Sequence, residues 1–326
     1  DIKHLSKESF SFKNVGEAQA TRNSSQDAIN SIAKVLPTFF GGSADLSHSN
    51  MTFIKGEGLQ DDAHRTERNI QFGVREFAMA TVLNGMMLHG GVRVFGGTFF
   101  VFSDYLKAAL RLSALQNLPV TYVFTHDSIA VGEDGPTHEP IEHLASLRTI
   151  PNTYVFRPAD ATETQAAWYL AQNVNDKPTS IVLTRQNLPV LENSSFEKVA
   201  KGAYVVYETS SDFDTILIAT GSEVALAISV AEELEREGMK VRVVSMPSIE
   251  LFEEQTSEYK EALLPRSIRR RVSLEMGNTA LWYKYVGLDG LAIGINKFGA
   301  SAPANKVIEE YGFSVEKVVA RIKNEL

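Results

Sequence analysis

Strands and helices alternate through most of this 326-residue chain. Short β-branched and aromatic runs, such as 92–95 and 120–124, indicate strands, and longer segments with a helical apolar stripe separate them. Such alternation predicts parallel sheets joined by right-handed crossovers. We therefore expect an α/β protein with two doubly wound domains, each built on a mostly parallel sheet flanked by helices.

The alternation lapses once, in a polar stretch near residue 195. Two domains is also the natural expectation for a chain of this length. We predict a linker over residues 1–20, one domain over 21–190 and a second over 200–326.

Three local patterns carry more specific expectations. Ser24, with Asp27 three residues on, predicts that a helix begins with Ser24 as its N-cap. The helix from about Val74 to His89 is apolar nearly all round, which indicates burial on most of its faces. The turn Ala219–Ser222 precedes a helix and could cradle a phosphate. It lacks the full dinucleotide-binding pattern, so we favour a purely structural turn.

Composition limits the classes of partner. The net charge of −8 argues against nucleic acid or an anionic membrane surface, although a local basic pocket is still possible. Without cysteine there is no disulfide, thiol nucleophile or zinc–thiolate site, which fits a reducing compartment. No apolar run reaches transmembrane length, and no signal peptide is present. The chain begins with Asp1 rather than methionine, which is expected of a piece of a longer protein.

The most distinctive polar segment directly follows the strand 120–124 and reads THDSIAVGEDGPTHEP, from Thr125 to Pro140. Its two histidines, His126 and His138, flank three acids, Asp127, Glu133 and Asp134. Ligand sites in open α/β sheets lie beyond the carboxyl ends of the strands, so this loop is a candidate binding site. A solvated acidic loop is the alternative.

Four further residues allow two interpretations each. Phe99, Phe102 and Tyr105 recur at three-residue spacing across a strand-to-helix junction. They are either ordinary core residues or an aromatic box for a planar ring. Glu76 opens the apolar helix, either as an acid favoured by the helix dipole or as a buried hydrogen-bond partner.

Ends of other elements carry polar groups too. Arg22 precedes the first helix and Arg185 ends a strand. Each arginine alone is more often a surface residue, but together with His126 the two could bind a phosphate. Asp45 and Ser49 follow a glycine pair in a strand-end turn.

Five motifs together resemble the transketolase family, the thiamine-diphosphate enzymes of the pentose phosphate pathway. They stand in that family's order and close to its spacing: GGSADL, FGVREFAM, GGTFFVF, THDSIAVGEDGPTHEP and LTRQNLP. The resemblance runs from about Glu17 to the end of the chain. It covers the family's pyrimidine-binding domain (21–190) and C-terminal domain (200–326). The GDG motif that holds Mg²⁺ and the cofactor's diphosphate is not found here, so the resemblance implies metal ligands on another domain and none in this chain.

The resemblance also implies roles for single residues. Glu76 would act catalytically by hydrogen-bonding N1′ of the aminopyrimidine, which favours the tautomer that activates thiamine diphosphate. Phe99, Phe102 and Tyr105 would form an aromatic pocket around the pyrimidine, with Phe102 stacking on the ring. Asp45 would lie near the cofactor at the subunit interface. The resemblance implies six substrate contacts: Arg22, Ser49, His126, Asp134, His138 and Arg185. Of these, His138 is also expected to act near the reacting centre.

The implied reaction transfers a two-carbon ketol unit from a ketose phosphate to an aldose phosphate, in a cytoplasmic homodimer. We expect the chain to be the C-terminal two-thirds of such an enzyme and inactive alone. A natural split-gene subunit, active only with a separate diphosphate-binding partner, is one alternative. The other is a non-catalytic binding or regulatory relative, against which the presence of Glu76, His126, Asp134 and Arg185 speaks.

Overall fold

Strands and helices alternate along the whole computed structural model, which describes residues 5–326. The elements of the first half are η2 Lys7–Ser9, β1 Ala18–Ala20, α1 Thr21–Val35, β2 Phe39–Ser43, α2 Ser47–Asn50, β3 Asn69–Gln71, α3 Glu76–His89, β4 Arg93–Phe99, η3 Phe100–Phe102, α4 Ser103–Leu115, β5 Thr121–Thr125, η4 Ile129–Val131, α5 His143–Arg148, β6 Tyr154–Phe156, α6 Ala161–Asn173, β7 Thr179–Leu183 and β8 Asn187–Pro189. Those of the second half are α7 Phe196–Val199, β9 Tyr204–Glu208, β10 Thr215–Ala219, α8 Glu223–Arg236, β11 Val241–Ser245, α9 Ile249–Glu253, α10 Ser257–Leu263, β12 Arg270–Leu274, η5 Ala280–Trp282, α11 Tyr283–Val286, β13 Leu291–Ile293, α12 Ala304–Glu310 and α13 Val315–Glu325.

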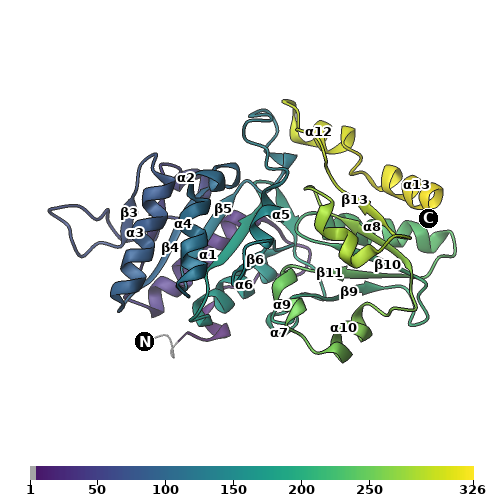
Figure 1. Cartoon of the computed structure of the whole chain (residues 1–326), viewed down its shortest axis with the longest axis horizontal. Coiled ribbons are helices and arrows are strands. Elements are labelled where there is room, and N and C mark those ends of the chain that lie inside the picture. The colour runs from purple at the N-terminus through teal and green to yellow at the C-terminus, as the bar shows by residue number, and fades with distance from the viewer. Residues whose placement is uncertain (1–4) are drawn as a thin grey trace.

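The two halves lie side by side along the long axis of the molecule (Figure 1). The first holds a six-stranded parallel sheet in the order β3-β2-β4-β5-β7-β6. The second holds a five-stranded sheet in the order β13-β12-β10-β11-β9, in which only the edge strand β9 runs antiparallel. The predicted class, two mostly parallel sheets flanked by helices, is confirmed. Among the described residues, no helix is both long and apolar enough to cross a membrane.

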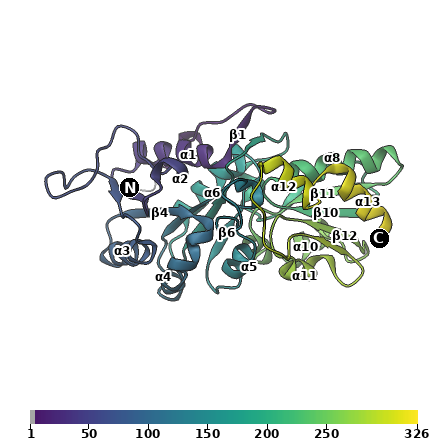
Figure 2. The same ribbon diagram turned by 90° about the horizontal axis from the view of Figure 1, so that it is seen from above.

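The six-stranded sheet has an apolar core on each face, because neighbouring residues of a strand point to opposite sides. In β5, Val123 lies in the core beneath α1 and α6. Its neighbours Tyr122 and Phe124 lie in the core beneath α3 and α4. Figure 2 shows these helices on opposite sides of the sheet. The first core continues into the second half under α8 and α13, so the two halves share apolar contacts.

The first helix does not begin where the sequence predicted. Helix α1 starts at Thr21, with Ala20 as its N-cap, so the predicted cap at Ser24 is wrong. Ser24 lies inside the helix, and its hydroxyl donates back to the side chain of Gln19 at 3.0 Å. The helix can start early because the chain enters it directly from β1, which pairs with β8.

The predicted burial of the helix 74–89 on most faces is also wrong. Helix α3 buries Met79, Ala80 and Leu83 against β4 and α4. On its other side Phe77 and Leu88 are 51% and 62% exposed. Among residues 5–326, this face of α3 therefore remains an exposed apolar surface.

Much of the predicted linker packs on the first half. Its residues 1–4 lie outside the described part of the chain, but Leu5 and Phe10 are buried in the first core. The ring of Phe10 packs edge-on against Tyr169 and Phe196. An apolar residue within a polar stretch thus anchors the segment.

Candidate active site

Four neighbouring strands of the first sheet, β2, β4, β5 and β7, end at one edge. In the register of the sheet, Phe99 pairs with Thr125, and Thr125 pairs with Leu183. Residues that follow these strand ends therefore leave the sheet at the same level. This parallel register brings Phe99, His126 and Arg185 to one site although they are far apart in sequence.

Aromatic and imidazole rings gather at this edge. The ring centroids of Phe99 and His126 are 4.5 Å apart, and those of Phe102 and His138 are 5.5 Å apart. Phe99 and Phe102 stack at 6.0 Å with 19° between their planes. Phe99 and Phe102 are half-buried, and Tyr105, 5.9 Å from Phe102, is 66% exposed. None of these three aromatics is therefore a fully buried core residue, and each keeps part of its surface exposed.

Two threonines bring the arginines together. Thr21 and Thr184 exchange hydrogen bonds, with the amide of Thr184 donating to the Thr21 hydroxyl at 2.7 Å and the amide of Thr21 donating to the Thr184 hydroxyl at 3.1 Å. Arg22 and Arg185 follow these threonines directly. The charge of Arg185 accordingly contributes, after burial, to a lowered pKa of Arg22.

In the described part of the chain, each arginine has guanidinium nitrogens without a hydrogen-bond partner. Arg22 donates from Nη1 to the backbone carbonyl of Ser49 at 2.9 Å, and Arg185 donates to that of Val131 at 2.8 Å. The Nε of Arg22 is buried without a hydrogen-bond partner among the described residues. A buried donor without a partner costs free energy until a ligand or water satisfies it.

His126 lies between these cations and the aromatic rings. It is 6% exposed, and its Nδ1 has no hydrogen-bond partner in the described part of the chain. Burial, followed by the charges of Arg22, Arg185 and His138, lowers the pKa of His126 to about 3. The imidazole is therefore neutral at pH 7 and can offer one donor and one acceptor.

The remaining predicted site residues lie around this group or outside it. Glu76 is the first residue of α3 and is 9% exposed. Ser49 contributes its carbonyl oxygen, as above. Asp45 sits in the turn after β2 with φ of 67° and is exposed. Asp134 is exposed too.

Comparison with known proteins bears on this arrangement. Residues 17–190 match the family model "Transketolase, pyrimidine binding domain", and residues 202–314 match "Transketolase-like TK C-terminal domain". The chain belongs to the transketolase family. The "Probable transketolase" of Streptococcus pneumoniae is 71% identical over 309 residues, which are 95% of this chain and 47% of that protein. The transketolase of Bacillus subtilis is 57% identical over 312 residues, which are 94% of this chain and 47% of that protein. The chain thus spans about half the length of the curated relatives it matches, not the two-thirds expected.

Solved transketolase structures match the whole fold. The transketolase of Leishmania mexicana superposes with a TM-score of 0.92 at 42% identity, over 96% of this chain and 46% of that chain. A structure titled "Split gene transketolase, inactive beta4 tetramer" matches with a TM-score of 0.75 at 26% identity. That match covers 94% of this chain and 98% of the other. A transketolase-family protein of nearly the same extent thus exists as a separate chain.

The residues present fit the pyrimidine half of thiamine diphosphate, which the transketolase family implies. The stacked, half-buried rings of Phe99 and Phe102 suit a flat heterocycle. The largely buried carboxyl group of Glu76 provides a hydrogen-bonding partner of the kind that a ring nitrogen requires.

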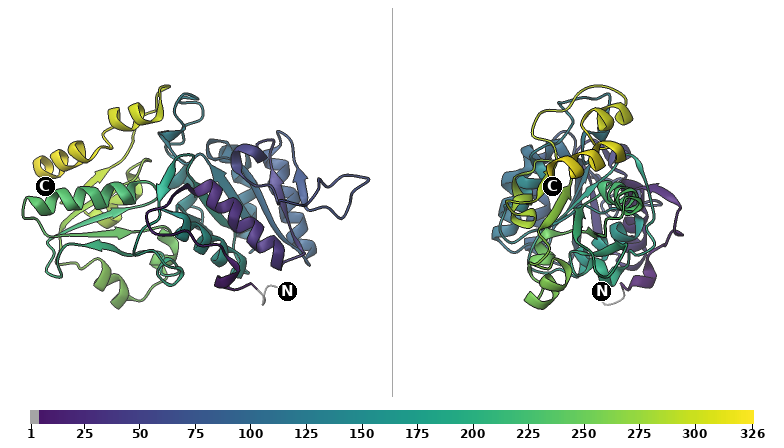
Figure 3. Two further views of the ribbon diagram at one scale, coloured as in Figure 1. Left: turned by 180° about the vertical axis from the view of Figure 1, so that it is seen from behind. Right: turned by 90° about the vertical axis from the view of Figure 1, so that its right-hand side faces the viewer.

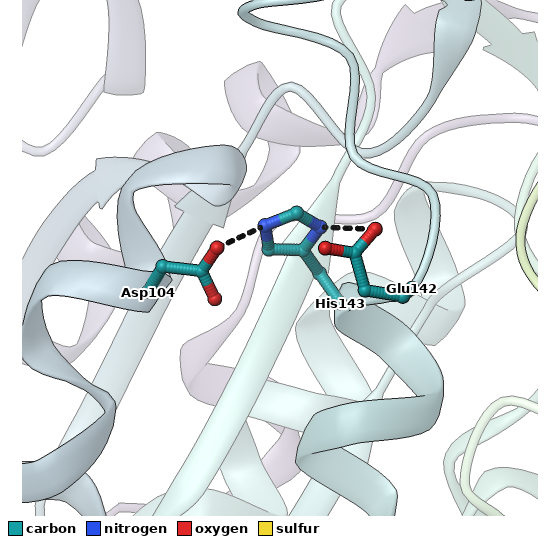
Figure 4. Close-up of side chains that lie close together, drawn as sticks. All are labelled: Asp104, Glu142 and His143. Carbon is teal, nitrogen blue, oxygen red and sulfur yellow. Dashed lines mark hydrogen bonds and ion pairs between the residues drawn. The ribbon is translucent and has the colours of Figure 1, made fainter. Parts of the chain in front are cut away.

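One group of side chains has the composition of a metal site. It comprises Asp104, Glu142 and His143, drawn in Figure 4. Nε2 of His143 is 3.1 Å from Asp104, while Nδ1, on the other side of the ring, is 3.9 Å from Glu142. An imidazole that separates two carboxylates in this way does not direct them at one ion. The ammonium group of Lys107 also lies 3.0 Å from the Asp104 carboxylate, so we assign no metal ion to this group of three side chains.

Sequence reasoning missed one pair beside the site. Asp127, directly after His126, accepts two hydrogen bonds from Arg157, from Nε at 3.0 Å and from Nη2 at 2.8 Å. Nη1 of Arg157 donates to the carbonyl of Thr220 at 3.1 Å, so the turn Ala219–Ser222 holds a guanidinium rather than a phosphate. The only signal in the sequence is an arginine placed directly after a buried strand, where a charge needs a partner.

Proposed function

We propose that this chain supplies the pyrimidine-binding domain (21–190) and the C-terminal domain (200–326) of a thiamine-diphosphate-dependent transketolase. The reaction transfers a two-carbon ketol unit from a ketose phosphate to an aldose phosphate, within the pentose phosphate pathway and in the cytoplasm. One observation carries the proposal. Two arginines and a neutral histidine converge beside partly exposed aromatic rings, and two of their buried nitrogens lack hydrogen-bond partners within residues 5–326.

The cations would bind the phosphate end of the sugar. Arg22 and Arg185 neutralise the phosphate charge through charge-assisted hydrogen bonds. His126, held neutral at pH 7, donates or accepts a single hydrogen bond. Ser49, whose carbonyl accepts a hydrogen bond from Arg22, would also contact this phosphate.

The other side chains would act on the rest of the substrate. His138 packs edge-on against both Phe99 and Phe102, and this packing supports a role for its nitrogens near the proposed reacting centre. Asp134, on the exposed tip of the same loop, would contact substrate hydroxyls.

Thiamine diphosphate, when bound, supplies the electron sink that stabilises the transferred carbanion equivalent. Glu76 would hold a proton at N1′ of its pyrimidine, Phe99, Phe102 and Tyr105 would enclose the ring, and Asp45 would lie near the cofactor at the subunit interface. Mg²⁺ and the diphosphate would be held by a diphosphate-binding partner domain or chain.

Two partners would complete the enzyme: that diphosphate-binding half and a second copy of this chain. The exposed apolar residues of α3 and α4 form a surface for the homodimer: Phe77, Val82, Leu88, Tyr105, Leu112 and Leu115. Alone, the chain would be inactive.

The test is reconstitution. The purified chain is assayed with thiamine diphosphate, Mg²⁺, xylulose 5-phosphate and ribose 5-phosphate, with and without a separately produced diphosphate-binding half. We expect turnover only in the complete mixture. Turnover by the chain alone would refute its inactivity. Absence of turnover in a mixture that forms a folded complex would refute ketol transfer.

A natural split-gene subunit is the second candidate, and the extent of the match to the solved split-gene chain favours it. Copurification from the source organism of a separate protein that carries the diphosphate site would support it. A non-catalytic relative is the third candidate. It gains ground if Glu76→Ala leaves ketol transfer unchanged in the complete enzyme.

A further inference from the structure

The second half of the chain contributes no predicted site residue, yet it contacts the substrate loop from His126 to Glu139 at several points. We propose that this half is a clamp that holds the loop 126–139 in its substrate-facing conformation. The proposal goes beyond ketol transfer, and it rests on the proposed function only in naming the loop's ligand a sugar phosphate.

The first attachment is a buried charge network at the start of the loop. Asp127 is bound by Arg157, whose Nη1 also pairs with Glu223 of α8 in the second half. The side chains of all three are no more than 1% exposed. Although burial lowers it, the pKa of Arg157 is raised by Glu223 and Asp127, so the guanidinium is charged and both carboxylates are its counter-ions.

The same network reaches the helix that follows the loop. Thr220 accepts from Arg157 at 3.0 Å and donates to Glu275 at 2.5 Å. Glu275 in turn accepts two hydrogen bonds from Arg148 at the end of α5, at 2.8 and 2.9 Å. Buried ions are costly unless paired, so these partners cannot separate freely. Both flanks of the loop are therefore tied to one set of residues in the second half.

The second attachment is at the tip of the loop. The Ser301 hydroxyl donates to the backbone carbonyl of Glu133 at 2.6 Å. Gly135 adopts φ of 75°, and a Cβ there would meet Cβ of Ser301 at 3.0 Å. Gly132, with φ of 85°, lies against Ala304 at the start of α12. In Figure 1 and, from behind, in Figure 3, the teal loop after β5 lies against the yellow segment at α12.

Glu139, the last residue of the loop, also packs against the second half. Glu139, next to His138, is 2% exposed, and a Cβ at Gly299 would overlap its carboxyl group. The two histidines of the loop are thus each followed by a residue that is tied to the second half. Asp127, after His126, is tied through Arg157, and Glu139, after His138, packs directly against Gly299. A shift of the second half would move both imidazoles relative to Phe99 and Phe102.

Hydrogen–deuterium exchange of the 326-residue chain tests the clamp without any need for catalysis. The variants are Arg157→Lys, which keeps the charge but loses the two-pronged contact with Asp127, and Ser301→Ala and Gly299→Ala at the tip. Tyr154→Phe is the matched control, because it removes another hydrogen bond between the halves, the 2.7 Å bond to Glu254, away from the loop.

We expect amides of residues 126–139 to exchange about tenfold faster in Arg157→Lys, with β5 and β10 unchanged. Smaller increases confined to 132–139 are expected in the two tip variants, and none in Tyr154→Phe. A folded Arg157→Lys with wild-type exchange in the loop would overturn the clamp. If Arg157→Lys unfolds globally, Ser301→Ala and Gly299→Ala provide the test. Wild-type exchange of the loop in both of these variants would overturn the clamp.

In the reconstituted enzyme, the clamp predicts that Arg157→Lys raises KM for ribose 5-phosphate about tenfold while Tyr154→Phe does not. A wild-type mixture without turnover would refute the proposed function and leave the exchange result valid. The two failures are therefore distinguishable.

Discussion

The imidazole of His126 lies 4.5 Å from the ring of Phe99, centroid to centroid. Phe99 ends β4 and His126 directly follows β5, the neighbouring strand, whose register aligns Thr125 with Phe99. Phe99 belongs to the proposed cofactor pocket and His126 to the proposed phosphate site. Their contact therefore marks the point at which cofactor and sugar phosphate would meet.

Replacing Arg185 by Ala in the reconstituted enzyme should raise KM for the aldose phosphate about 10- to 100-fold, with a smaller effect on kcat. The reason is loss of charge-assisted hydrogen bonds to the phosphate. Steady-state kinetics with ribose 5-phosphate measure it. Arg266→Ala is the control, since that side chain is 93% exposed in the second half. An unchanged KM in Arg185→Ala would remove Arg185 from the site.

Glu76→Ala should lower kcat at least about 100-fold with little change in KM for the sugars, because Glu76 would act on the cofactor and not on the substrate. Glu258→Ala is a matched control: it too is an acid in the first turn of a helix, but it lies far along the chain in α10. Equal kcat values for Glu76→Ala and Glu258→Ala would show that Glu76 is only a helix-terminal acid.

His126 should make the folded chain sensitive to mild acid. Its pKa falls from an ordinary 6.5 to about 3 on folding, because it is buried beside Arg22 and Arg185. Between these values the unfolded chain binds more protons, so stability falls as pH falls. This group contributes about 1.4 kcal/mol per pH unit to the decrease in the free energy of unfolding.

Denaturant unfolding at pH 6, 5 and 4 measures this effect. His126→Asn should have a shallower pH dependence of the free energy of unfolding than wild type, because the replacement has no group that titrates in this range. Identical slopes for wild type and His126→Asn would contradict the prediction.

Glu139 should have the opposite effect on the pH dependence of stability: it should make the folded chain less stable as the pH rises. Burial raises the pKa of Glu139 from an ordinary 4.5 to about 7, and among the described residues neither carboxylate oxygen has a hydrogen-bond partner. The folded state then binds more protons between these values, so stability is lost as pH rises through 7. Glu139→Gln should raise the free energy of unfolding by about 1–3 kcal/mol at pH 8 and change it little at pH 4.

The control for this experiment is Glu133→Gln, an exposed acid of the same loop. It should leave the free energy of unfolding unchanged at both pH values. A loss of stability in Glu139→Gln at pH 8 would mean that the ionised carboxylate is favoured in the fold.

The open face of α3 should mediate self-association. Val82→Glu should weaken dimerisation at least about tenfold, because it places a charge on the apolar open face of α3. Val82 itself is 48% exposed in the single chain. Sedimentation velocity measures it. Leu288→Glu, at a fully exposed leucine of the second half, should have no effect. A wild-type chain that stays monomeric at high concentration would refute this interface.

Much of the candidate site could be predicted because its residues stand next to strand ends. Arg185, His126 and Phe99 each occupy such a position, and a parallel sheet collects strand ends at one edge. Asp127 and Arg157 could not be paired in this way. Their contact also depends on Thr220 and Glu223, which belong to the other sheet-bearing half.

Local pattern was sufficient for the alternating elements and the α/β class, because periods of 2 and 3.6 depend only on near neighbours along the chain. It failed for the start of α1, where pairing of β1 with β8, some 170 residues away, determines where the helix begins. It failed again for α3, since periodicity reports how apolar a helix is but not what covers it. Burial, pKa shifts and the clamp on the loop 126–139 arise from contacts between distant segments, and only the tertiary structure contains those contacts.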